Sequence, residues 1–199
     1  MAAVMSTLDA AGWDDEVARL RRGDPDAVAA LVARYQHRLF RYLLRFVHDR
    51  SVAEDLFQQT WLKVMERIRT YHPGRSFEAW LFSVAHNTAI DYLRRKRPES
   101  LDDPLPSGAT KEETLSAGQA DALERYLALE RSALVASAVA ELPAIHREVL
   151  TLRFEEDLRL EEIAGVIDAP LSTAKSRLKR ALDGLRRRLE SRLRAGDLL

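Results

Sequence analysis

The sequence contains no cysteine, so a disulfide framework, a thiolate metal site and thiol catalysis are all excluded. Its five histidines are scattered, and no two of them have the HxxxH or HExxH spacing of a zinc site. No apolar run approaches the roughly 20 residues that a membrane span requires. The first residues also lack the basic segment and apolar stretch of an export signal. We therefore expect a cytoplasmic protein with no membrane insertion, no metal and no cofactor.

The alternation of apolar and polar residues that strands require is also missing, whereas helical periodicity is present almost throughout. Asp24 followed by Pro25 predicts the start of one long amphipathic helix. Ser51 with Glu54 has capping-box spacing and predicts a second helix that runs to about residue 69. A third is expected from Phe77 to the proline at 98. The sequence thus predicts an all-α fold.

Residues 99–120 differ from the rest of the chain, because they are rich in proline, glycine, acidic and small residues and contain no aromatic residue. Such a segment cannot bury enough apolar area to offset the entropy of ordering it. We expect a flexible acidic linker there. It would join two small helical domains, one over residues 13–98 and the other over residues 121–194.

The formal net charge of zero conceals a strong segregation of charge. Residues 1–98 carry +4, residues 99–162 carry −9, residues 163–170 carry −1 from Asp168, and residues 171–199 carry +6. A uniformly neutral surface binds DNA poorly, because affinity comes from cations placed against phosphates. The basic runs Arg94–Arg97 and Lys175–Arg194 instead indicate two separate DNA-binding regions, although each run alone also fits a solvated helix face.

The sharpest local pattern is a helix-turn-helix over residues 158–182. Two apolar helix faces flank Asp168-Ala169-Pro170, and small Ala164 lies where the helices must approach closely. Asp168 occupies a turn position that favours left-handed backbone, which aspartate tolerates. The outward face of the second helix is hydroxylic at its start and basic further on, which suits insertion into the major groove. Any short helix pair in an all-α protein gives a similar pattern, but the basic outer face favours DNA.

Four segments in this order resemble the extracytoplasmic-function sigma factors, compact members of the primary-sigma family that keep only domains two and four. They are GDPDAVAALVARYQHRLFRYLLRFV, AEDLFQQTWLKVMERI, FEAWLFSVAHNTAIDYLRRKRP and, after the expected linker, ELPAIHREVLTLRFEEDLRLEEIAGVIDAPLSTAKSRLKRAL. The resemblance implies a non-enzymatic factor that binds core RNA polymerase and directs promoter-specific initiation. Domain two would melt and read the −10 element of promoter DNA, and domain four would read the −35 element.

The resemblance also implies roles for individual residues. The polymerase-binding set is Asp55, Gln58, Gln59, Trp61, Leu62 and Lys63. Periodicity alone, however, places Trp61 in the core. The family usually has glutamate at position 59, so Gln59 removes a charge from this set.

The −10 element set is Tyr71, Arg75, Asn87, Asp91, Arg94, Arg95 and Lys96. Single-stranded recognition needs a pocket for a flipped base and cations for the backbone, which the loop at 71–76 and the basic run would supply. The −35 element set is Ser172, Thr173, Lys175, Ser176, Arg177, Lys179 and Arg180. Ser172 stands where the family commonly has glycine, and it is expected to act as an N-cap.

Two other functional classes compete with the sigma factor. A one-component helix-turn-helix regulator would explain residues 121–194 but leaves the AEDLFQQTW helix without a purpose. An enzyme would have to use carboxylates that are adjacent in sequence and lack a histidine, serine or glycine-rich partner motif. The resemblance further implies control by an anti-sigma protein.

Overall fold

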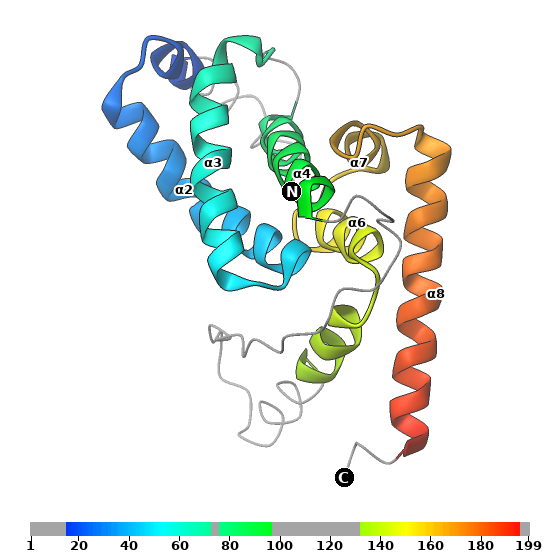
Figure 1. Ribbon diagram of the computed structural model, residues 1–199. Coiled ribbons are helices and arrows are strands. Elements are labelled where there is room, and N and C mark those ends of the chain that lie inside the picture. The colour runs from blue at the N-terminus through cyan, green and yellow to red at the C-terminus, as the bar shows by residue number, and fades with distance from the viewer. Residues whose placement is uncertain (1–14, 73–75, 97–131, 196–199) are drawn as a thin grey trace, which may run out of the picture.

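The computed structural model describes residues 15–72, 76–96 and 132–195, and all regular structure in these ranges is helical (Figure 1). The main helices are α2 (Pro25–Val47), α3 (Arg50–Arg67), α4 (Phe77–Lys96), α6 (Ala144–Phe154), α7 (Leu160–Val166) and α8 (Leu171–Ala195). A 3-10 turn, η1 (Ile68–Thr70), follows α3, and shorter helices occupy residues 15–21 and 132–140. The all-α prediction is confirmed, and the expected linker at 99–120 lies outside the described residues.

The sequence predicts the N-cap residue of α2 correctly but not that of α3. Asp24 caps α2 as predicted, accepting hydrogen bonds from the amides two and three residues on. At α3 the cap is Asp49, which accepts a 3.2 Å hydrogen bond from the amide of Val52, so the prediction of Ser51 is wrong. The reason lies in His48, whose left-handed backbone (φ 55°) ends α2 and leaves Asp49 extended, as an N-cap must be.

Helices α2, α3 and α4 form an N-terminal group that packs around aromatic side chains. The rings of Tyr42 and Phe82 lie 5.1 Å apart, joining α2 to α4. The ring of Tyr71 packs at 5.3 Å from Phe77 and 5.5 Å from Trp80, which closes the group where α4 begins. These contacts hold α3 and α4 side by side and fix their outer faces.

Helices α6, α7 and α8 form a C-terminal group with the predicted helix-turn-helix. Asp168 adopts left-handed backbone (φ 46°), as the sequence predicts. Ala164 on α7 and Ala174 and Ala181 on α8 are buried, since only small side chains allow the helices to approach closely. This turn fixes the direction in which α8 leaves the group.

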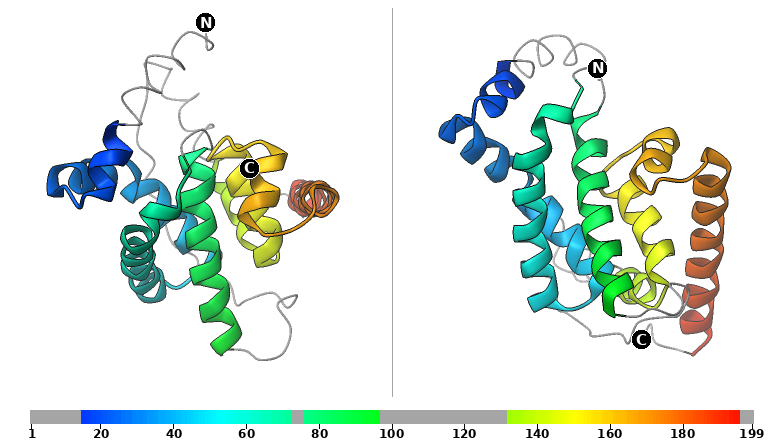
Figure 2. Two further views of the ribbon diagram at one scale, coloured as in Figure 1. Left: turned by 90° about the horizontal axis from the view of Figure 1, so that it is seen from above. Right: turned by 45° about the horizontal axis from the view of Figure 1, so that its top comes forward.

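The two groups pack against each other through α2 with α6 and through α4 with α7. Figure 2 shows α4 beside the C-terminal helices, while α8 lies on their far side, away from α2 and α3. In the ranges that the structure describes, no helix has the length and apolar character to cross a membrane.

Candidate nucleic-acid interface

Helix α8 carries all seven residues predicted for the −35 element within its first three turns. Five of the side chains are exposed: Ser172, Lys175, Ser176, Lys179 and Arg180. Thr173 and Arg177 are half-buried on the same face. No acidic residue occurs between 171 and 182. The face therefore offers hydroxyl groups at its N-terminal end and cations beyond them, which matches the order in which a recognition helix meets bases and phosphates.

The start of α8 differs from the sequence prediction in one detail. The helix begins at Leu171, and the carbonyl of Pro170 accepts hydrogen bonds from the amides of Thr173 (2.8 Å) and Ala174 (3.1 Å). Ser172 is thus inside the first turn, so its prediction as an N-cap is wrong. Ser172 is exposed at this position.

Helix α4 presents a second polar and basic face. Asn87, Asp91, Arg94 and Arg95 are exposed at steps of three and four residues, which places them along one side of the helix. The Asp91 carboxylate lies 3.8 Å from the ammonium group of Lys63 on α3. Lys63, predicted for polymerase, and Asp91, predicted for DNA, are therefore partners in the free protein. That pairing leaves Asn87 as the uncharged base-reading candidate on this face.

Lys96 extends this face at the C-terminal end of α4, where its ammonium nitrogen lies 5.7 Å from the ring centroid of Tyr92. Cations in the last turn of a helix are favoured by the helix dipole and are well placed for phosphates. Lys96 is exposed, as Arg94 and Arg95 are. The basic run therefore projects from the end of α4 as a cationic tip.

The loop before α4 shows an arrangement that the sequence does not reveal. Tyr71 is only 2% exposed, so its ring is part of the core and does not face solvent. Its backbone carbonyl accepts a 2.5 Å hydrogen bond from the guanidinium of Arg21. Arg75, the other predicted residue here, lies outside the described residues. Tyr71 thus fixes the start of the loop.

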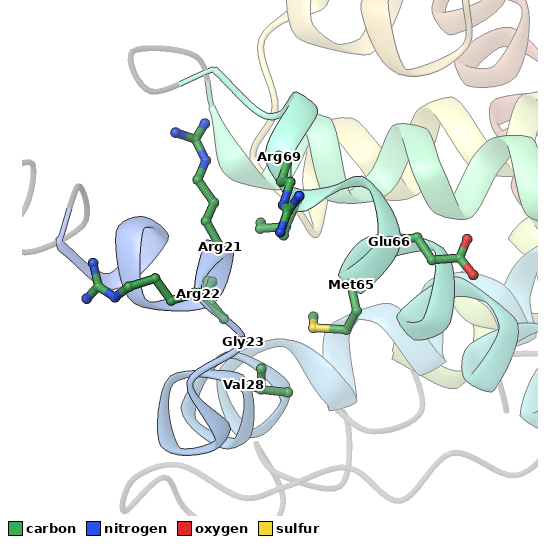
Figure 3. A pocket seen from close by; sticks show the side chains of 9 residues that line it. Arg21, Arg22, Gly23, Val28, Met65, Glu66 and Arg69 are labelled. Atoms are coloured by element: carbon green, nitrogen blue, oxygen red, sulfur yellow. The ribbon is translucent and has the colours of Figure 1, made fainter.

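A hollow of about 460 Å³ opens beside Arg21, between the N-terminal helix and the end of α3 (Figure 3). Arg21, Arg22 and Arg69 line it, with Met65 among its apolar residues. The sequence gives no reason to group these arginines, because 47 positions separate Arg22 from Arg69. The only sequence signal is the Arg21-Arg22 pair before a glycine. Of the three arginines, Arg21 is the one bonded to the start of the loop, through the Tyr71 carbonyl, whereas the side chain of Arg22 points away from Arg69 (Figure 3).

Helix α3 carries the residues predicted to contact polymerase, and burial separates them into two sets. Asp55, Gln58, Gln59 and Leu62 are exposed at helical spacing, and Leu62 is 65% exposed. Trp61 is 8% exposed and packs against Phe57 at 6.2 Å between ring centroids, so it belongs to the core, as periodicity indicates. The exposed stripe therefore combines one carboxylate, two amides and an uncovered leucine.

The described residues contain no group of three or more histidine or acidic side chains with metal-binding geometry. The buried acidic residues Glu148 and Glu156 are bonded to side chains of the N-terminal group, Tyr42 and Arg38 respectively. The site residues are thus suited to binding nucleic acid and protein through hydrogen bonds and charge.

Comparison with known families assigns both groups of helices. Sigma-70 region 2 matches residues 31–99, and Sigma-70 region 4 matches residues 138–187. The first range contains α3 and α4, and the second contains the helix-turn-helix.

Curated relatives match over most of their length. The RNA polymerase sigma-H factor of Pseudomonas aeruginosa is 34% identical over 181 residues, covering 89% of this chain and 94% of the relative. The ECF RNA polymerase sigma-E factor of Escherichia coli K12 is 30% identical over 185 residues, with the same shares covered.

A solved structure with a similar fold is the sigma factor RpoE of Bartonella quintana in complex with the anti-sigma factor NepR. Its TM-score is 0.63 at 21% identity, covering 81% of this chain and 96% of that chain. The chain belongs to the extracytoplasmic-function sigma factors, the RNA polymerase subunits that direct promoter-specific initiation.

Proposed function

We propose that this sigma factor divides its work among three faces: α3 binds core RNA polymerase, α4 reads the −10 element and α8 reads the −35 element. The observation that supports the proposal best is that the three faces are exposed on three different helices. Polymerase, melted DNA and duplex DNA can therefore each reach a separate surface. We further propose that the protein acts in the cytoplasm, where polymerase is found, and that it is not an enzyme.

The polymerase-binding face is the stripe of Asp55, Gln58, Gln59 and Leu62 on α3. Interfaces between proteins favour a central apolar anchor surrounded by satisfied polar groups, and Leu62 is the apolar member here. Lys63 contributes at the edge of the stripe, where its pairing with Asp91 holds it. Trp61 supports the stripe from below, since its ring is buried.

The −10 element is read on α4 and beside the loop at 71–76. Asn87 supplies donor and acceptor groups for a base edge, and Arg94, Arg95 and Lys96 hold phosphates. The arginines of the neighbouring hollow, Arg21 and Arg69, would add cations for the displaced strand. Tyr71 does not contact DNA through its ring, because the ring is buried in the core. Its role in this proposal is to hold the start of the loop in place, through the hydrogen bond that its carbonyl accepts from Arg21. Arg75 remains a proposed contact on the basis of the family resemblance.

The protein is also proposed to be held inactive by an anti-sigma partner. RpoE of Bartonella quintana has a similar fold, and its structure was solved in complex with the anti-sigma factor NepR. The uncovered leucine of α3 is the kind of apolar feature that a competing protein would cover in place of polymerase. Direct competition between an anti-sigma protein and core polymerase would support this part of the proposal.

The experiment that tests the polymerase face is a binding titration with core polymerase. Leu62→Asp should weaken binding at least about tenfold, or 1.4 kcal/mol, because it removes an anchor and places a charge in the interface. Leu62 is exposed in the free protein, so the fold should be unaffected. Val135→Asp is the matched control, since Val135 is also an exposed apolar residue (42%) but lies in the helix at 132–140. Equal loss in both variants, or in neither, would contradict the assignment.

A further inference from the structure

The N-terminal helix, residues 15–21, lies before the range that Sigma-70 region 2 matches, which begins at residue 31. Its buried residues Val17 and Leu20 are 1% and 2% exposed and belong to the same core as α2, α3 and α4. Its first turn is held by an ion pair between Glu16 and Arg34 on α2, at 3.2 Å. The N-terminal helix is therefore an integral part of the N-terminal group.

The turn after this helix fixes the direction of its last residues. Gly23 has a positive φ of 74°, which glycine adopts without strain. The amides of Gly23 and Asp24 donate hydrogen bonds to the carbonyls of Leu20 (3.0 Å) and Arg19 (3.1 Å). The guanidinium of Arg19 also donates to the carboxylate of Asp24 at 2.7 Å, and the same carboxyl group caps α2. The end of the helix, with Arg21, thus has a defined position relative to α2.

Arg21 uses this position to hold the chain that follows η1. Its guanidinium donates the 2.5 Å hydrogen bond to the Tyr71 carbonyl. The amide of Tyr71 donates to the carbonyl of Ile68 at 3.3 Å, and its ring packs against the rings of Phe77 and Trp80. The carbonyl, the amide and the ring of Tyr71 are therefore all engaged. The chain that enters the loop at 71–76 starts from one fixed direction.

The far end of the loop is held by a second side chain from outside it. The hydroxyl of Tyr35 on α2 donates a 2.8 Å hydrogen bond to the carboxylate of Glu78 in the first turn of α4. Burial first, and the Glu78 charge second, raise the pKa of Tyr35 well above its usual range, so the hydroxyl remains a donor. The Tyr35 ring lies 5.4 Å from that of Phe77, and the Ser76 hydroxyl accepts a 3.1 Å hydrogen bond from the amide of Ala79. Both ends of the loop are thus anchored.

The anchor at Arg21 is not explained by stability alone. The Nε atom of Arg21 is buried and has no hydrogen-bond partner among the described residues. An unsatisfied buried donor is costly, and each one in a folded protein calls for an explanation. A methionine at this position would have a stem of similar length and no unpaired donor. In Figure 3 the side chains of Arg21 and Arg22 leave the end of the helix in different directions, so the two arginines do not share one role.

Selection among bases requires this kind of support. A base edge is read by hydrogen bonds, whose strength falls steeply when distance and angle depart from their optimum. A misplacement of about 1 Å is enough to lose much of such an interaction. The groups that read a base must therefore be held by neighbours that do not touch it. Contacts with phosphates depend mainly on charge, so they tolerate more movement.

We propose that Arg21 and Tyr35 are positioning residues for selection of bases in the −10 element, an inference that rests on the function proposed above. They hold the two ends of the loop in the orientation that selects bases, and neither acts by reading a base itself. The positive charge that Arg21 offers to the displaced strand is shared with Arg69. The hydrogen bond to Tyr71 distinguishes Arg21 from that neighbour. A segment that precedes the matched region 2 thus contributes to promoter selectivity.

The motion of a spin label tests the anchor directly. Because the chain has no cysteine, His72→Cys gives a single labelling site, and position 72 is exposed. Arg21→Met should make the label more mobile and narrow its EPR spectrum, because Tyr71 loses the bond to its carbonyl. Arg69→Met is the matched control, since it removes the same charge from the same hollow and should leave the spectrum unchanged. Equal spectra for Arg21→Met and the unmodified protein would overturn the anchor.

Urea unfolding separates positioning from a purely structural role. Arg21→Met removes one hydrogen bond and also removes the unpaired Nε donor, and these two effects oppose each other. The unfolding midpoint should therefore change little, and binding to core polymerase and to a −35 duplex should be unchanged. A large fall in the midpoint together with weaker −35 binding would show that Arg21 serves the fold as a whole, which contradicts the proposal.

Base selection is measured by transcription with core polymerase from a promoter library. A promoter found by start-site mapping is randomised across its −10 element, and a barcode in each transcript identifies its template. Arg21→Met should reduce the preference for the favoured bases at least about fivefold, the lower end of the discrimination against one mismatched base pair. Arg69→Met should lower total transcription and keep the preference. An unchanged preference in Arg21→Met would overturn the proposal.

Tyr35→Phe tests the second anchor with a smaller change. The variant keeps the ring and its packing against Phe77 and loses only the hydroxyl that is bonded to Glu78. It should relax the preference at the same base positions as Arg21→Met, and unchanged selection would contradict the role of Tyr35. If the unmodified protein selects no base in the −10 element, the proposed function fails, while the label at position 72 still decides whether Arg21 anchors the loop.

Discussion

At the scale of single residues, His48 connects the end of α2 to the contact between the two groups. Its left-handed backbone ends the helix, and its side chain is half-buried near Arg147. Burial first, and the positive charge of Arg147 second, lower the pKa of His48 to about 4. Burial also lowers the pKa of Arg147 to about 10, so that residue stays charged at neutral pH. His48 is therefore held neutral beside a permanent cation.

This shift predicts how stability depends on pH. Histidine in an unfolded chain has a pKa near 6.5, so between about pH 6.5 and pH 4 the unfolded protein binds a proton that the folded protein does not. The contribution of His48 to the free energy of unfolding should be complete above pH 6.5 and should fall as the pH is lowered towards 4. Urea unfolding at a series of pH values measures this.

The matched variant for this prediction is His48→Asn. Asparagine does not titrate, and it tolerates the left-handed backbone that this position requires. The variant should show a smaller loss of stability between pH 6.5 and pH 4 than the unmodified protein. If both proteins lose stability equally over that range, His48 is not the responsible group.

At the scale of elements, α8 offers the sharpest test of DNA recognition. Arg177→Ala should weaken binding to a −35 duplex by about 1–3 kcal/mol if its guanidinium contacts a base, and it should relax the preference at that base pair. Gel-shift titration against the matched and altered duplexes measures both effects. Arg186→Ala on the same helix serves as the control, because Arg186 is exposed more than two turns further on. Unchanged promoter use by Arg177→Ala would remove the assignment.

The elements that the sequence predicts well are those with a local cause. The apolar stripe of α2, the left-handed Asp168 and the small Ala164 all follow from residue spacing and backbone chemistry, and the structure confirms each. The predicted caps at Ser51 and Ser172 are wrong because each helix begins earlier, α3 at Arg50 after the capping Asp49 and α8 at Leu171, which leaves both serines inside the first turn. The position of an N-cap depends on the backbone angles of one or two residues. The periodic pattern of apolar residues carries no information about those angles.

The contacts that the sequence does not predict join residues far apart in the chain. Arg21 meets the Tyr71 carbonyl across 50 positions, and Arg38 meets Glu156 across 118. Contacts between residues so far apart in the chain produce no periodic pattern in the sequence. Each of the arginines, taken alone, resembles an ordinary charged residue at the surface. The hollow at Arg69 and the docking of the two groups were therefore inaccessible to sequence reasoning, although the helices that form them were not.

At the scale of the whole molecule, one chain combines the three proposed binding faces with a contact between α4 and α7. The neutral overall charge agrees with this arrangement, because the basic faces of α4 and α8 are balanced by acidic residues elsewhere. Glu148, Glu155 and Glu156 are among these acidic residues, and each forms a hydrogen bond or an ion pair with a side chain of α2. Charged side chains thus hold the two groups of helices together, and the proposed DNA contacts also depend on charge.

The measurement that tests the central claim most directly is run-off transcription with purified core polymerase on a library of genomic fragments, followed by mapping of the start sites. With this protein added, transcripts should begin at a limited set of positions that share two upstream sequence elements, and Leu62→Asp should abolish them. If the protein neither associates with core polymerase nor produces transcripts with shared upstream elements, the assignment of its three faces is contradicted.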